Sequence, residues 1–140
     1  MNKWLVVLLN LILAQGIALA DPILGRWFIL DDHTGKKIAT VILERDHDKV
    51  SGRIAKLDAT TAQPVTCELC TGAFRDQPLI GMKFIWDLTM QKNGVCGGGH
   101  MLDFKTGKVY RARLKEVKQQ LYVRQYVGTP YLGHTHIWVR

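Results

Sequence analysis

The segment from 79 to 90 alternates between apolar and other side chains, and this pattern limits the folds open to the chain more than any other feature. Every second residue is apolar, in the order Ile80, Met82, Phe84, Trp86, Leu88 and Met90. A period of two is that of a β-strand, whose successive side chains point to opposite faces. Because burial of each large apolar side chain contributes roughly 1.5–3 kcal/mol, this face is predicted to lie in the core.

Similar short apolar segments recur along the chain, separated by clusters of Gly, Asp, Asn and Pro. Their spacing of about ten residues is typical of an antiparallel sandwich or barrel, and it predicts an all-β fold of about eight strands. The expected strands span residues 24–30, 37–45, 49–57, 79–90, 99–103, 108–116, 120–127 and 135–139. Two connections, 32–36 and 103–108, begin with Asp and end in Thr-Gly-Lys, which predicts hairpin turns.

The first twenty residues have the three parts of a secretory signal peptide. Lys3 precedes an apolar run over 4–13, and Ala18-Leu19-Ala20 precedes Asp21. Cleavage is therefore expected after Ala20, leaving one domain over 21–140 in the periplasm or the medium. The apolar run is shorter than the roughly 20 residues that cross a bilayer, so the chain is not expected to span a membrane.

The charge of the chain favours anionic partners. The net charge of +7 falls to +6 when the signal peptide, with Lys3 as its one charged residue, is removed. The basic residues are scattered through strand-like segments instead of forming a run with interleaved aromatics, so no nucleic-acid partner is expected. The domain over 21–140 is long enough to bury one hydrophobic core, and we expect it to be a monomer.

Three cysteines follow the signal peptide. In an oxidising compartment Cys67 and Cys70 most simply form a local disulfide, which leaves Cys96 free; a bond from either one to Cys96 is the alternative. The Cys67–Cys70 pair lies in the long irregular stretch from 58 to 78. Loops of that length often act as lids, so a short helix or a disulfide-pinned flap is predicted there.

A Gly-x-Trp pattern, Gly25 to Trp27, opens the first expected strand. In lipocalin-like barrels a Trp at this place lies across the closed end, where an Arg from a late strand stacks on it. Trp27 is therefore expected to be structural, with Arg124 or Arg140 as its partner.

Motifs over nearly the whole expected domain resemble the domain-of-unknown-function 2147 family of exported bacterial proteins. They are DPILGRW at 21–27, TGK at 34–36, GRI at 52–54, CELCTG at 67–72, PLIGM at 78–82, GHMLD at 99–103, TGKVY at 106–110, VRQY at 123–126 and Trp138. The resemblance implies a small lipocalin-like (calycin) barrel with a cavity, similar to fatty-acid-binding proteins. It implies no activity. The chain differs from the usual family pattern at Phe104, Gln125, Cys96, His134 and His136.

A barrel of eight strands either fills with side chains or holds one small ligand. The expected ligand is small, amphipathic and anionic, such as a fatty acid. Met82, Phe84 and Trp86 are predicted to line the cavity. Arg124, Tyr126 and Arg111 are predicted to hold the head group, because Arg124 and Tyr126 share a strand face and a guanidinium binds a carboxylate through two hydrogen bonds.

Two further functions are compatible with the sequence. A ligand-free barrel would serve as a protein-interaction or envelope-associated module. A zinc- or haem-binding barrel would use His134, His136 and Cys96 as metal ligands. No catalytic triad or pair of carboxylates stands out, so neither an enzyme nor a cofactor is expected, and the sequence favours a binding protein.

Overall fold

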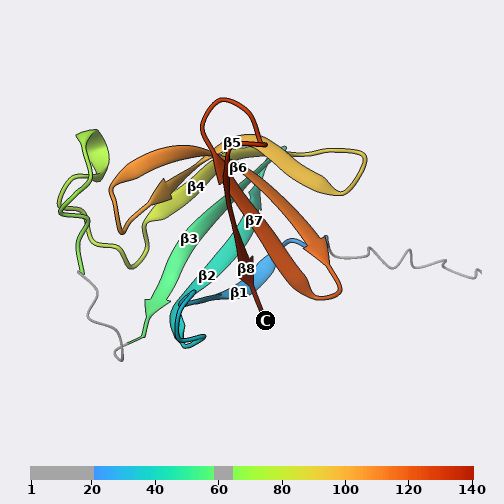
Figure 1. Cartoon of the computed structure of the whole chain (residues 1–140). Helices are drawn as coiled ribbons and strands as arrows, with labels where there is room; N and C mark the ends of the chain where they lie inside the picture. Colours follow the sequence, from blue (N-terminus) through green and yellow to red (C-terminus); the bar gives the residue numbers. More distant parts are fainter. Residues whose placement is uncertain (1–20, 59–64) are drawn as a thin grey trace, which may run out of the picture.

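The computed structural model describes residues 21–58 and 65–140 (Figure 1). The predicted signal peptide lies outside the described residues. Eight antiparallel strands follow one another in chain order around a single sheet. They are β1 (Gly25–Leu30), β2 (Lys37–Asp46), β3 (Lys49–Leu57), β4 (Lys83–Met90), β5 (Val95–Asp103), β6 (Lys108–Val117), β7 (Gln120–Tyr126) and β8 (Gly133–Trp138). The predicted eight-strand all-β fold is confirmed.

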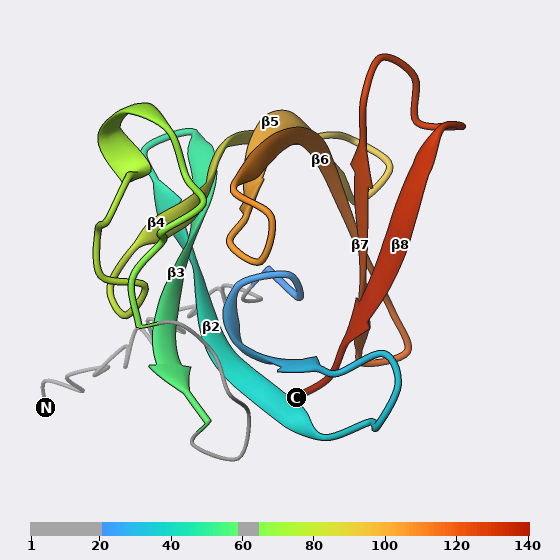
Figure 2. The ribbon, with the colours of Figure 1, turned by 60° about the vertical axis from the view of Figure 1, so that its left-hand side comes forward.

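The sheet closes on itself where β8 returns to β1 (Figure 2). The Phe28 N–H donates to the Val139 carbonyl at 2.6 Å, and the Val139 N–H donates back to Phe28 at 3.1 Å. These two bonds form a single bridge, which is the seam of the barrel, and among the described residues β8 has no other backbone pairing with β1.

The two predicted hairpin turns have the same local chemistry. In the first, Asp31 and not Asp32 caps the turn, because its Oδ1 accepts from the N–H groups of His33 and Thr34 at 2.9 and 2.8 Å. Both bonds lower the pKa of Asp31 from its ordinary value, and the bond from the Thr34 N–H has the larger effect. In the second, Asp103 Oδ1 accepts from the Lys105 N–H at 2.9 Å.

Strand β4 begins at Lys83, later than the sequence predicts. Gly81 has a φ of +86°, which interrupts the extended backbone, so Ile80 is 57% exposed and not in the core. A second positive φ, +58° at Asp87, interrupts the alternation within the strand. Ile85, which the sequence places on the opposite face, is fully buried. Strand β5 also differs, because it begins at Val95 and runs through a register shift in the glycine cluster.

The long connection between β3 and β4 carries both predicted features, a disulfide and a short helix. Cys67 and Cys70 are bonded, and η1 (Gly72–Phe74) follows. We call residues 65–82 the flap. It packs on the β5–β6 turn, where the Cys67 sulfur contacts the Phe104 carbonyl oxygen at 4.0 Å. Cys96, the third cysteine, is free and buried.

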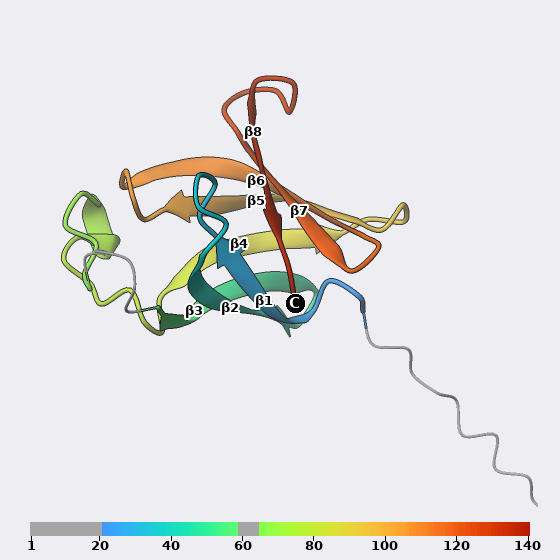
Figure 3. The same ribbon diagram turned by 60° about the horizontal axis from the view of Figure 1, so that its bottom comes forward.

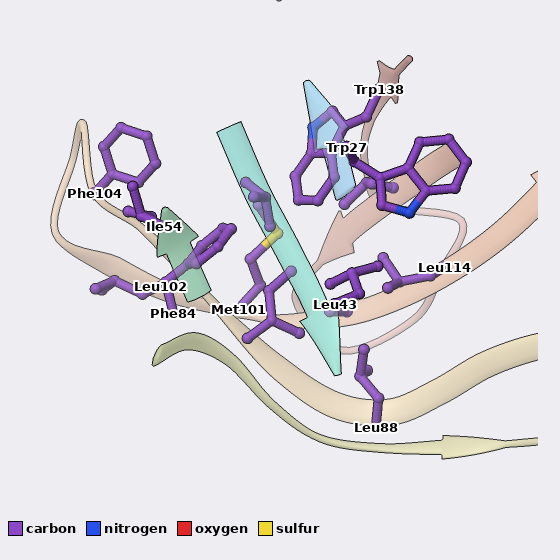
Figure 4. Packing of buried hydrophobic residues seen from close by; sticks show 14 of the residues in the cluster. Trp27, Leu43, Ile54, Phe84, Leu88, Met101, Leu102, Phe104, Leu114 and Trp138 are labelled. Atoms are coloured by element: carbon purple, nitrogen blue, oxygen red, sulfur yellow. The ribbon is translucent and has the colours of Figure 1, made fainter. Parts of the chain in front are cut away.

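Large apolar side chains occupy the inside of the barrel. Figure 4 shows the core side chains of Trp27, Leu43, Met101, Leu114 and Trp138 gathered from different strands. Of these, Trp27 and Leu114 are fully inaccessible to solvent. Eight-stranded barrels of this size have interiors that side chains can fill, and most of this interior is filled.

The Trp27 ring has two polar contacts that fix its position. Its Nε1–H donates to the Ile23 carbonyl at 2.7 Å. The Arg140 guanidinium lies 3.8 Å from the centroid of the ring, so Arg140, and not Arg124, is the stacking partner. Arg140 also donates to the Pro22 carbonyl. The segment before β1 and the residues after β8 are therefore held together around one indole.

Candidate ligand sites at the barrel mouth and on the outer face

A small pocket opens at the end of the barrel where β1 and β5 turn into β2 and β6. We call it the mouth pocket. Its volume is about 70 Å³. Its lining consists of Ile29, Leu30, Asp32, Ile38, Met101, Leu102, Asp103, Phe104, Lys105, Gln125, His136 and Trp138. The ends of three strands supply the apolar lining, with Ile29 and Leu30 from β1, Met101 and Leu102 from β5, and Trp138 from β8. The two Asp-capped turns supply its charged rim.

The polar groups of the mouth pocket differ in how they are satisfied. His136 Nδ1 lies 3.4 Å from Asp32 Oδ2, so these two side chains pair at the rim. Gln125 is only 6% exposed, and its side-chain amide forms no hydrogen bond among the residues that the structure describes. Neither its nitrogen nor its oxygen is among the fully buried unsatisfied atoms of the described residues, so Gln125 presents an accessible donor and acceptor to whatever enters the pocket.

The predicted cavity residues do not line this pocket. Phe84 supports it from behind, because its ring centroid lies 6.1 Å from those of Phe104 and Trp138. Trp86 instead stacks on His100, with ring centroids 5.6 Å apart, and contacts the flap through Phe74. Met82 lines a separate shallow hollow beside the flap.

A second hollow follows the outer face of β6, β7 and β8. We call it the outer groove. Its volume is about 720 Å³, and its lining consists of Asn93, Val95, Arg113, Lys115, Val117, Tyr122, Arg124, Pro130, Tyr131 and Thr135. Arg113 lies directly opposite Arg124 in the β6–β7 pairing. Three cations and no acidic residue line the groove.

The predicted head-group residues lie on this outer side. Arg124 lines the groove and donates to the Pro130 carbonyl and to Thr135 Oγ1, each at 2.9 Å. Arg111 is exposed and is paired with Tyr126 in the sheet. The structure therefore places Arg111, Arg124 and Tyr126 on the neighbouring strands β6 and β7, and none of them lines the mouth pocket.

The predicted metal ligands are not brought together. His134 and His136 are both on β8, whereas Cys96 is on β5, and no group of three metal-ligating side chains exists among residues 21–58 and 65–140. Burial raises the pKa of the Cys96 thiol to about 11, with the Asp21 carboxylate acting in the same direction. Cys96 therefore stays protonated at neutral pH, which makes it a poor ligand and a poor nucleophile.

Comparisons with known proteins agree with this architecture. The model of a family described as "Uncharacterized protein conserved in bacteria (DUF2147)" matches residues 25–140. No curated protein matches the chain. The chain is similar to the solved structure of protein HP1028 from the human pathogen Helicobacter pylori, which belongs to the lipocalin family. The two are 20% identical with a TM-score of 0.72, over 84% of this chain and 81% of that chain. Within the described residues, no helix is both long and apolar enough for a membrane crossing.

Proposed function

The chain belongs to the DUF2147 family of bacterial proteins, and from its lipocalin-like fold we propose that it binds a small amphipathic molecule at the mouth pocket. The apolar part of the ligand packs on Phe104 and Trp138. Its polar group exchanges hydrogen bonds with the Gln125 amide. The proposal is for binding and not for catalysis.

The unpaired amide of Gln125 is the observation that supports this proposal. The amide nitrogen and oxygen keep some accessible surface, since neither is among the fully buried unsatisfied atoms of the described residues. A ligand that offers a hydroxyl, carboxyl or amide group can form hydrogen bonds with this amide, because Gln125 can both donate and accept. The surrounding wall is apolar, so a molecule with one polar group and an apolar remainder complements the pocket.

The volume of the mouth pocket limits what enters it. About 70 Å³ compares with about 30 Å³ for one water molecule in the liquid, so a short apolar group fits. A longer ligand such as a fatty acid requires the turns at 31–36 and 103–108 to separate. A fatty acid is a large ligand within the class that we propose. A short-chain alcohol or acid is therefore the better first probe.

The variant Gln125→Leu is expected to weaken hexanol binding by about tenfold, because the lost hydrogen bonds are worth about 1–1.5 kcal/mol. The same variant is expected to leave the free energy of unfolding nearly unchanged, because the Gln125 side chain has no hydrogen bond to another described residue that could be lost. Titration by NMR chemical shifts and urea denaturation measure the two effects. Arg113→Gln, in the outer groove, serves as the control and should leave hexanol binding unchanged. Destabilisation of Gln125→Leu with unchanged binding would show that the amide has a structural role.

We also propose that the protein is exported and begins at Asp21. The signal-like organisation of residues 1–20 supports this, as does the Cys67–Cys70 disulfide, since disulfides persist mainly in oxidising compartments. When the full chain is expressed in bacteria, mass spectrometry should find a protein starting at Asp21 outside the cytoplasm. Full-length protein retained in the cytoplasm would contradict export.

A further inference from the structure

The loop between β7 and β8, residues 127–132, exposes three large apolar side chains. Tyr131 is 92% exposed, Leu132 71% and Val127 66%. In Figures 1, 2 and 3 this loop projects beyond the strands that it connects. Tyr122 and Ile137, which are cross-strand partners, are also exposed on the sheet, with the Arg124–Thr135 pair between them and the loop. Three large apolar side chains exposed together in one projecting loop indicate a contact site.

The outer groove adds positive charge beside this loop. Arg113, Lys115 and Arg124 line the groove together with Tyr131, and the lining includes no Asp or Glu. The whole chain is also basic, with a net charge of +7. The partner of this surface is therefore expected to be both negatively charged and able to accept apolar side chains.

Arg124 fixes the projecting loop in place. Its guanidinium donates to the carbonyl oxygens of Pro130 and Tyr131, at 2.9 and 3.4 Å, and to Thr135 Oγ1 on β8. The loop backbone is thus tied to the sheet while the Tyr131 and Leu132 side chains remain exposed. A preordered loop loses less conformational freedom on binding than a flexible one.

We propose that the β7–β8 loop and the outer groove dock on the surface of an anionic phospholipid bilayer. Tyr131 and Leu132 enter the interfacial region, where aromatic and apolar side chains are favoured, while Arg113 and Lys115 contact lipid phosphates. A soluble anion would use only the cations. A stable protein partner usually covers about 800 Å² of a surface, whereas a bilayer accepts a small projecting loop. The proposal is independent of the mouth pocket, since these residues do not line it.

Co-sedimentation with lipid vesicles tests this docking. The protein is the chain from Asp21, which contains every described element, because the apolar run at 4–13 would bind lipid by itself. Vesicles with about one-third phosphatidylglycerol in phosphatidylcholine are expected to bind it at least about tenfold more tightly than pure phosphatidylcholine. This preference should largely vanish in about 1 M NaCl, where the Debye length is about 3 Å. No binding to the anionic vesicles at low salt would overturn the proposal.

Two double variants separate the charged and apolar contributions. Arg113→Gln with Lys115→Gln should weaken anionic-vesicle binding by at least about tenfold, since each basic residue near such a surface contributes about fivefold. Tyr131→Ser with Leu132→Ser should also weaken it by about tenfold. If this second variant binds like the unaltered protein, the groove is a site for soluble anions and membrane docking is wrong.

Matched controls remove equivalent side chains from other surfaces. Val65 and Leu69 are exposed apolar residues of the flap, and Lys36 and Lys56 are exposed lysines outside the groove. Val65→Ser with Leu69→Ser, and Lys36→Gln with Lys56→Gln, should each change vesicle binding by less than about twofold. Losses in these controls as large as those in the loop and groove variants would contradict a localised docking surface.

Discussion

The variant Trp27→Ala is expected to lower the free energy of unfolding by about 3–5 kcal/mol, which is the usual cost of removing a fully buried large aromatic ring. Trp27 is inaccessible to solvent, and three separate parts of the chain depend on it. It pairs with Val41 across β1 and β2, bonds the Ile23 carbonyl, and lies beneath the Arg140 guanidinium. Urea denaturation followed by far-ultraviolet circular dichroism measures the loss.

Two companion variants divide this loss into its parts. Trp27→Phe keeps an apolar ring but removes the Nε1–H, so it should retain more stability than Trp27→Ala. Arg140→Gln leaves the ring in place and removes the cation, with an expected loss of about 0.5–2 kcal/mol. A loss below about 1 kcal/mol in Trp27→Ala would mean that the indole does not hold the barrel together.

The variant Gly107→Ala is expected to lower the free energy of unfolding by about 2–4 kcal/mol and to weaken hexanol binding. Gly107 has a φ of +76°, and a Cβ there would lie 2.0 Å from the Leu69 carbonyl oxygen in the flap. Alanine strains this backbone by about 1–2 kcal/mol and also forces the flap away from the turn. Because Phe104 belongs to the same turn and lines the mouth pocket, the pocket wall moves as well.

Gly35 provides the matched control for Gly107. It occupies the corresponding place in the β1–β2 turn, with a φ of +68°, but a Cβ there has nothing within 4 Å. Gly35→Ala therefore carries only the backbone strain, about 1–2 kcal/mol. The difference between the two variants in chemical denaturation measures the contact between flap and turn. Equal losses would show that this contact contributes nothing to stability.

The sequence predicted the fold well where local pattern decides it. Turn chemistry and alternation placed all eight strands, and the three-residue separation of Cys67 and Cys70 correctly favoured their disulfide. The errors in β4 come from backbone conformation. Gly81 and Asp87 both have positive φ, and a positive φ at an Asp within a strand has no reliable sequence signal.

The candidate sites were harder to predict from the sequence than the fold was. Gln125 follows Leu121 and Val123 at a spacing of two, so the pattern already placed it on the buried face of β7. That signal was available, but the sequence favoured its neighbour Arg124 for a ligand carboxylate. The bonds from Arg124 to the carbonyls of the β7–β8 loop depend on how that loop folds back, which alternation does not encode.

The seam between Phe28 and Val139 has a consequence for the order in which the protein is made. Strand β1 emerges from the ribosome more than a hundred residues before Val139, its partner at the seam. Trp27 likewise emerges more than a hundred residues before Arg140. The barrel therefore cannot close during most of translation, since this pairing joins the most distant parts of the domain.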